Sequence, residues 1–125
     1  MLTVRNLSFA YGEIQTLNGV NISIDRGEMV SVIGRNGVGK TTLVRNILGL
    51  ENAASGTVSL NGEDISSRPA HYRAIKGMGY VPQGRMIFPK LSVEENLGIA
   101  LAASDKKKQG IPERIYEYFP VLKEM

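Results

Sequence analysis

The residues best suited to chemistry in this sequence are closely spaced glycines followed by a lysine and a threonine. Residues 34–41 read Gly-Arg-Asn-Gly-Val-Gly-Lys-Thr, which is the spacing of a phosphate-binding P-loop. Glycines allow the backbone N–H groups of such a loop to point inward around an anion. The Lys40 ammonium group would then reach the β- and γ-phosphates of a nucleotide, and the Thr41 hydroxyl would bind a bridging magnesium ion.

The elements that must position this loop are a strand before it and a helix after it. The apolar residues 29–33 predict a buried strand, and residues 42–50 predict a helix. The positive end of that helix dipole would face the bound phosphates. An ordinary glycine-rich turn requires neither neighbour, so the pattern and its context together favour a phosphate site.

Composition indicates one ordinary globular domain. The chain has 125 residues, of which 42% are hydrophobic and 22% are charged, and its formal net charge is +3. The sequence has no cysteine, which excludes disulfides, thiolate metal sites and a cysteine nucleophile. We expect no secretory leader, and the apolar run at residues 97–103 is too short to span a bilayer. The lysines at 106–108 lack interleaved aromatic residues, so we expect a solvated loop and no nucleic-acid partner.

The opening of the chain predicts antiparallel β structure. Apolar residues fall on even positions up to Val4 and on odd positions from Leu7 onward. A strand changes parity only at a bulge or a break, which we place near residues 5–6. Gly12 then turns the chain, and residues 20–24 alternate again as a half-buried strand.

The middle of the chain predicts a hairpin, a helix and a further strand. Residues 57–60 form the first strand of the hairpin, and Asn61 with Gly62 has the signature of a type I′ turn. Pro69 suits the first turn of a helix that runs to about Lys76. Residues 78–81 predict a second buried strand, which Pro82 ends.

The last third of the chain predicts helices. Ser92 and Glu95 have the spacing of a capping box at a helix start. Residues 106–110 form a predicted linker, and Pro112 opens a last helix that ends near Pro120. His71 is the only histidine, and its place on the predicted 69–76 helix indicates a solvent-facing residue.

Taken together, these motifs resemble the first half of an ATP-binding-cassette (ABC) transporter ATPase subunit. The resemblance implies an α/β P-loop NTPase fold in three parts: an antiparallel β region at 1–28, a P-loop core at 29–91 and the start of a helical subdomain at 92–125. Within the class, residues 80–97 resemble importers of branched-chain amino acids and of urea or short amides. The segments that carry the resemblance are residues 9–12, 34–42, 55–56, 61–65 and 80–83.

The resemblance also implies roles for individual residues. Tyr11 would stack on adenine, although a strand-end tyrosine is the simpler alternative. Gln83 would be the Q-loop glutamine that contacts magnesium and the attacking water, the alternative being a polar residue of a surface loop. Lys40 and Gln83 are thus the catalytic candidates, and Thr41 and Gln83 are the metal ligands. The implied ATP contacts are Tyr11, Gly34, Arg35, Asn36, Gly37, Val38, Gly39, Lys40, Thr41 and Thr42.

The implied partners are ATP with Mg²⁺, transmembrane permease subunits and a second ATPase subunit, at the cytoplasmic face of the inner membrane.

The family's signature motif, Walker B strand and switch histidine are not in this sequence. Because water-positioning groups are central to phosphoryl transfer, we expect the 125-residue chain to be hydrolysis-incompetent. Two alternatives stay open: a nucleotide-binding module without turnover and a small P-loop kinase. The early antiparallel strands and the absence of an arginine-rich lid argue against the kinase.

Overall fold

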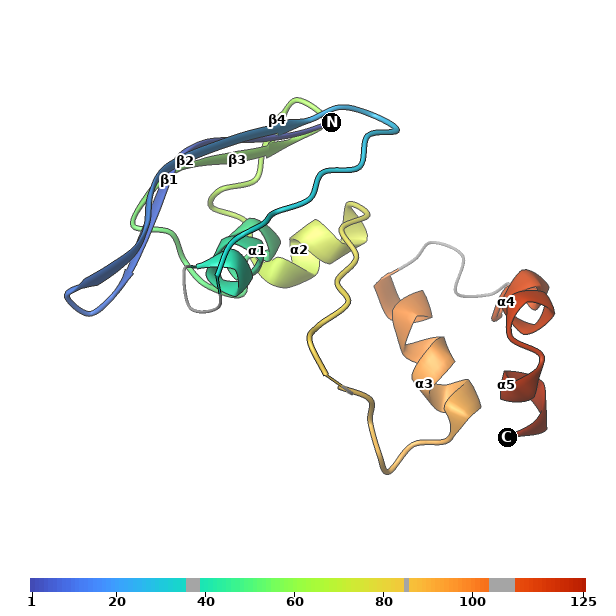
Figure 1. Cartoon of the computed structure of the whole chain (residues 1–125). Coiled ribbons are helices and arrows are strands. Elements are labelled where there is room, and N and C mark those ends of the chain that lie inside the picture. The colour runs from blue at the N-terminus through green and yellow to red at the C-terminus, as the bar shows by residue number, and fades with distance from the viewer. Residues whose placement is uncertain (36–38, 85, 104–109) are drawn as a thin grey trace. The chain divides into compact units, whose positions relative to one another are not determined.

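The structure is a computed structural model, and it describes residues 1–35, 39–84, 86–103 and 110–125. The described chain divides into two compact units, Met1–Met78 and Gly79–Met125. Figure 1 labels their helices and strands. The first unit holds the sheet and the helix that follows the P-loop, so the candidate phosphate site belongs to this unit.

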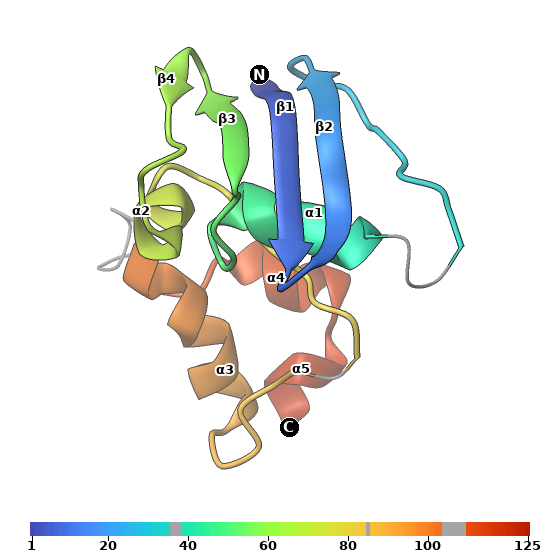
Figure 2. The same ribbon diagram turned by 90° about the vertical axis from the view of Figure 1, so that its left-hand side faces the viewer.

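The described part of unit 1 contains a four-stranded antiparallel sheet with the order β2-β1-β3-β4. Its strands are β1 (Leu2–Tyr11), β2 (Ile14–Ile24), β3 (Ser55–Leu60) and β4 (Glu63–Asp64). Figure 2 shows the four strands side by side. The predicted antiparallel opening is confirmed, and the sheet extends beyond it because β3 pairs with the other edge of β1.

The predicted change of parity in β1 is a bulge at Asn6. The pairing of β1 with β2 shifts register between Val4 and Leu7, and Asn6 has a φ of 50°. The Asn21 side chain accepts a hydrogen bond from the Asn6 amide at 3.0 Å. Val4 and Leu7 are both 1% exposed, so the bulge allows residues of opposite parity to enter the same core.

The predicted hairpin turn between β3 and β4 is also confirmed. Asn61 and Gly62 have φ values of 51° and 83°, the two positive angles that a type I′ turn requires. The Met1 ammonium group donates to Asn61 Oδ1 at 2.8 Å, and the Asn61 amide donates to the Met1 carbonyl at 2.8 Å. These bonds tie the hairpin turn to the start of β1.

Two helices cover one face of the sheet: α1 (Lys40–Leu48) and α2 (Ala70–Ile75) (Figure 1). The helix predicted from Pro69 is therefore confirmed, with Pro69 as its N-cap residue. The core lies between this face and the helices. Its buried apolar residues are Val4, Leu7, Phe9, Leu17, Leu43, Val58 and Ile65.

Two sequence predictions in the P-loop core are wrong: residues 29–33 and 78–81 do not form buried strands. Met29 and Ile33 are 95% and 92% exposed, and Val81 is 93% exposed. Neither segment pairs with a strand among the described residues. An apolar run becomes a strand only where a neighbour accepts and donates its backbone hydrogen bonds, so the local pattern was insufficient.

Unit 2 contains short helices in its described part: α3 (Val93–Ile99), the 3₁₀ helix η1 (Ala100–Ala103), α4 (Glu113–Tyr118) and α5 (Val121–Glu124). The capping box of α3 is confirmed by reciprocal bonds between Ser92 and Glu95, at 3.1 Å and 2.7 Å. Most of the predicted linker at 106–110 lies outside the described residues. Across both units, no described helix has the length and apolar character needed to cross a bilayer.

Candidate nucleotide-binding site

The two ends of the P-loop are joined by a hydrogen bond. The Lys40 ammonium group donates to the Gly34 carbonyl, which brings the first and the charged residue of the motif together. Gly34 and Arg35 are exposed coil, and Lys40 is half-buried as the first residue of α1. Asn36, Gly37 and Val38, which we predicted to contact phosphate, lie outside the described residues.

Gly39 is the residue at which the loop turns into α1. It is the N-cap of the helix and has a left-handed conformation, with φ 99° and ψ 8°. A Cβ atom at this position would lie 3.0 Å from the Thr16 carbonyl oxygen and 3.2 Å from a Leu17 methyl group. Only glycine accepts both this backbone conformation and this close approach to β2, so the sheet positions the loop.

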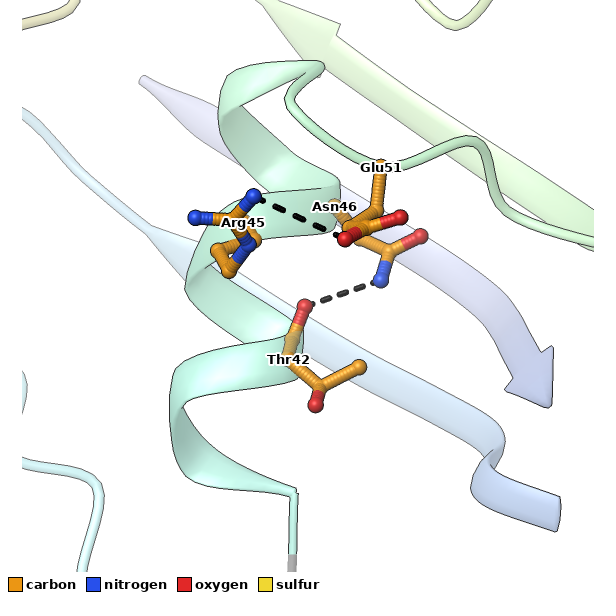
Figure 3. Close-up of polar contacts among 4 residues, drawn as sticks. All are labelled: Thr42, Arg45, Asn46 and Glu51. Atoms are coloured by element: carbon orange, nitrogen blue, oxygen red, sulfur yellow. Dashed lines mark hydrogen bonds and ion pairs between the residues drawn. The ribbon is translucent and has the colours of Figure 1, made fainter. Parts of the chain in front are cut away.

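The first turn of α1 places the two threonines differently. Thr41 is exposed, as the proposed magnesium ligand should be, whereas Thr42 is only 8% exposed. The Thr42 carbonyl accepts a hydrogen bond from Asn46 Nδ2 at 2.8 Å (Figure 3). The Leu43 amide continues the helix by donating to the Gly39 carbonyl at 2.8 Å.

The C-terminal end of α1 is fixed by a Schellman motif. The Gly49 amide donates to the Asn46 carbonyl at 3.1 Å, and the Leu50 amide donates to the Arg45 carbonyl at 2.9 Å. Gly49 has the left-handed φ of 79° that this motif requires. Figure 3 also shows the ion pair between Arg45 and Glu51, with nitrogen and oxygen 3.6 Å apart.

Arg73 is a buried residue that the sequence reasoning missed. It is 4% exposed, and its guanidinium group donates four hydrogen bonds to backbone carbonyls. Burial lowers the pKa of Arg73, and the nearby Asp64 carboxylate opposes that shift. Because two of the carbonyls belong to the last turn of α1, Arg73 neutralises the negative end of the P-loop helix. The four acceptors are the carbonyls of Asn46, Ile47, Ser66 and Arg68.

Gly49 makes room for the Arg73 guanidinium group. A Cβ atom at Gly49 would lie 2.9 Å from Arg73 Nε and 3.2 Å from Arg73 Cζ. Nothing in the local pattern of residues 70–76 identifies Arg73 as buried, because its partners lie 26 and 27 residues away in α1. The sequence signal for a close approach was a glycine, Gly49, near the end of the predicted helix.

The remaining candidates are exposed residues of the two units. Tyr11 ends β1, is 49% exposed, and packs edge-on against Phe9 with ring centroids 4.7 Å apart. Gln83 is exposed coil in unit 2, whereas Lys40 belongs to unit 1. His71 is exposed on α2, as the sequence predicted. The described residues contain no group of three or more metal-ligating side chains.

The comparison with known protein families identifies the class. Residues 17–123 match the family described as ABC transporter. The chain belongs to the ABC transporter family. Solved ABC proteins agree with this assignment. One, described as the ATP-binding subunit of an ABC transporter, superposes with a TM-score of 0.75 at 35% identity, over 99% of this chain and 50% of that one. The predicted ABC ATPase fold class is therefore confirmed.

Curated relatives of this ABC chain serve different transport systems. BraG, a high-affinity branched-chain amino acid transport ATP-binding protein of Pseudomonas aeruginosa, is 38% identical over 99% of this chain and 54% of BraG. A probable branched-chain amino acid transport protein, LivF of Archaeoglobus fulgidus, is 40% identical over 98% of this chain and 52% of LivF. LptB of Haemophilus influenzae, a lipopolysaccharide export ATP-binding protein, is 37% identical over 91% of this chain and 46% of LptB.

This ABC chain thus spans about half the length of the curated relatives that it matches. The same holds for a dimeric ATP-binding cassette solved in a post-hydrolysis state with ADP and phosphate. It superposes with a TM-score of 0.71 at 28% identity, over 82% of this chain and 47% of that one.

Proposed function

We propose that this chain binds Mg-ATP in its P-loop and belongs to the energy-coupling subunit of an ABC importer. The observation that carries the proposal is the closure of the loop by Lys40 and Gly34, with Gly39 turning the chain into α1. This arrangement gathers an ammonium group and the amide-rich end of a nine-residue helix at one place. Both favour a polyphosphate.

The residues of the loop fit the nucleotide and its metal. Lys40 would exchange the Gly34 carbonyl for phosphate oxygens, since a charged acceptor forms the stronger hydrogen bond. The exposed Thr41 hydroxyl would bind Mg²⁺ together with those oxygens. Thr42 is buried, so we assign its phosphate contact to the backbone amide. Bound Mg²⁺ supplies neutralisation of the phosphate charge.

The solute is proposed to be a branched-chain amino acid, or urea or a short amide. Two relatives at 38% and 40% identity are described as branched-chain amino acid transport proteins, which supports the importer assignment. LptB at 37% identity is described as part of an export system, so the identity values alone do not separate the two directions. In the importer, two ATPase subunits would act on permease subunits at the cytoplasmic face of the membrane.

The 125-residue chain itself is proposed to bind nucleotide without turnover. Gln83 is the residue that we propose to contact the attacking water. The 125-residue sequence contains neither a Walker B carboxylate nor a signature motif. Phosphoryl transfer depends on positioned charges around the transferred group. Contacts from Lys40 and Thr41 to the phosphates would therefore contribute to nucleotide binding much more than to hydrolysis.

Isothermal titration calorimetry of the full 125-residue chain with Mg-ATP tests the binding proposal. We expect one saturable site per chain, and phosphate release no faster than that of the Lys40→Ala variant. A folded chain that binds no Mg-ATP would overturn the proposed function. Robust ATP turnover by the pure chain would instead overturn only the assignment as a non-hydrolysing module.

A further inference from the structure

A polar cavity lies next to α1 in unit 1, and the nucleotide proposal does not use it. Its volume is about 90 Å³. Leu7 and Val58 provide part of an apolar wall, while polar side chains from α1, α2 and the intervening segments provide the rest. The polar lining includes Asn46, Glu51 and Arg73.

The Asn46 side chain has an oxygen atom, Oδ1, that accepts no hydrogen bond from the described residues. Asn46 is 2% exposed, and its Nδ2 group donates to the Thr42 carbonyl (Figure 3). Because a carbonyl can only accept, this bond fixes which end of the amide is nitrogen. Oδ1 is fully buried and has no hydrogen-bond partner among the described residues. An unsatisfied buried acceptor costs about 1–3 kcal/mol, so the cavity requires a donor.

The charges around the cavity restrict what that donor can be. The Arg73 guanidinium group disfavours a cation there, whereas the Glu51 carboxylate and Asn46 Oδ1 disfavour an anion. Arg73 has five N–H groups, and four of them donate to carbonyls in the described chain. Arg73 and Asn46 can therefore offer an N–H donor and an oxygen acceptor to a small neutral molecule.

We propose that this cavity is a binding site for ordered water. One water molecule donates to Asn46 Oδ1 and accepts from the remaining N–H of Arg73 Nη2. The volume exceeds the roughly 10–15 Å³ that one ordered water needs. Glu51 is half-buried and the neighbouring Asn52 and Ala53 are exposed, so water enters along that side. The site links the buried face of the P-loop helix to α2.

Nuclear magnetic resonance of the unmodified 125-residue chain tests the proposal directly. A long-lived bound water produces cross-peaks of opposite sign in NOE and ROE spectra. We expect such peaks between the solvent resonance and the Asn46 Hδ2 protons. The absence of water cross-peaks, peaks of the same sign in both spectra, or a protein N–H or O–H donating to Oδ1 would each overturn the proposal.

A variant provides a second test. Asn46→Leu removes the acceptor with little change in volume, and Asn18→Leu on β2 is the matched control because Asn18 is exposed. We expect water ¹⁷O relaxation dispersion to lose at least one long-lived water in Asn46→Leu and none in Asn18→Leu. An unchanged count in a folded Asn46→Leu chain contradicts the site. Should that variant fail to fold, the measurement on the unmodified chain decides.

Discussion

The Lys40 ammonium group is bonded to the carbonyl of Gly34, six residues earlier in the chain. The bond joins the first glycine of the phosphate motif to its only lysine, and it uses the group that we propose to bind ATP. Nucleotide must therefore replace a neutral acceptor with a charged one. A phosphate oxygen adds the attraction between opposite charges, which the neutral carbonyl lacks, so the exchange favours the bound state.

Removing the Lys40 ammonium group should weaken Mg-ATP binding. We expect Lys40→Ala to raise the dissociation constant by at least about tenfold, since a hydrogen bond to a charged group contributes about 1.5–3 kcal/mol. Calorimetry measures the change. Lys90→Ala is the control because Lys90 is exposed in unit 2 and the net charge changes equally. Equal affinities for the two variants would refute the role of Lys40.

A side chain at Gly39 should disrupt the start of α1. In Gly39→Ala the Cβ atom meets the Thr16 carbonyl at 3.0 Å in a backbone with φ 99°. Gly27→Ala is the matched control because Gly27 has φ 80° and nothing within 4 Å of its Cβ position. Both variants incur left-handed strain of about 1–2 kcal/mol. We expect only Gly39→Ala to lose Mg-ATP affinity as well, which calorimetry on the folded variants checks.

The role of Tyr11 predicts a loss of affinity that does not depend on the base. Aromatic stacking on a nucleobase contributes about 1–3 kcal/mol and tolerates any base. We therefore expect Tyr11→Ala to weaken ATP and GTP binding equally, by about 5-fold or more, and Tyr11→Phe to retain affinity. Competition binding with both nucleotides measures this. A loss confined to ATP would show that Tyr11 does something other than stack.

Replacing Arg73 should destabilise unit 1. Arg73→Met removes a donor from four backbone carbonyls. The Asn46 carbonyl keeps the Gly49 amide as a donor, and each of the other three that is left buried without a partner costs about 1–3 kcal/mol. We expect a loss of about 3 kcal/mol or more in the free energy of unfolding. Arg73→Lys should be nearly as damaging because one ammonium group cannot reproduce the planar fork. Urea denaturation compares both with Arg26→Met, whose arginine is exposed. A Met variant as stable as that control would disprove the anchoring role.

The Glu63 carboxyl should titrate below its ordinary pKa of 4.5. The main cause is the hydrogen bond from the Tyr72 hydroxyl, at 2.5 Å, and the positive charges of Lys76 and Arg68 add to it. Because the folded-state pKa is lowered, the stabilisation is complete above pH 4.5 and is lost as the pH falls through the folded value.

Tyr72→Phe should therefore raise the Glu63 pKa toward its ordinary value and reduce the acid-induced loss of stability. Carbon-13 NMR titration of the Glu63 carboxyl measures the shift, with Tyr116→Phe as the control in unit 2. A Glu63 pKa that is the same in Tyr72→Phe as in the unmodified chain would contradict the assigned cause.

Features fixed by local geometry could be predicted from the sequence. The parity change places the bulge at Asn6, and Asn61 with Gly62 adopts the expected left-handed turn. The capping box at Ser92 forms as its spacing indicated. In each case the residues that determine the structure lie within a few positions of one another, so one short window contains all the information.

Features that depend on distant partners could not be predicted in this way. Residues 29–33 have the composition of a buried strand, but a strand also needs hydrogen bonds from a neighbour. Arg73 appears in sequence as an ordinary helix-surface arginine, and its burial depends on carbonyls of α1. Within the candidate site, the phosphate motif and the helix after it were predictable, whereas the support from β2 at Gly39 was not.

The contact between Gly49 and Arg73 sets a rule for how this chain can diverge. A guanidinium nitrogen already occupies the space where any side chain at residue 49 would begin. A homologue with alanine at that position must therefore lack the arginine or redirect it. The two positions should vary as a pair, and an alignment that shows them changing independently would indicate a different end to the helix.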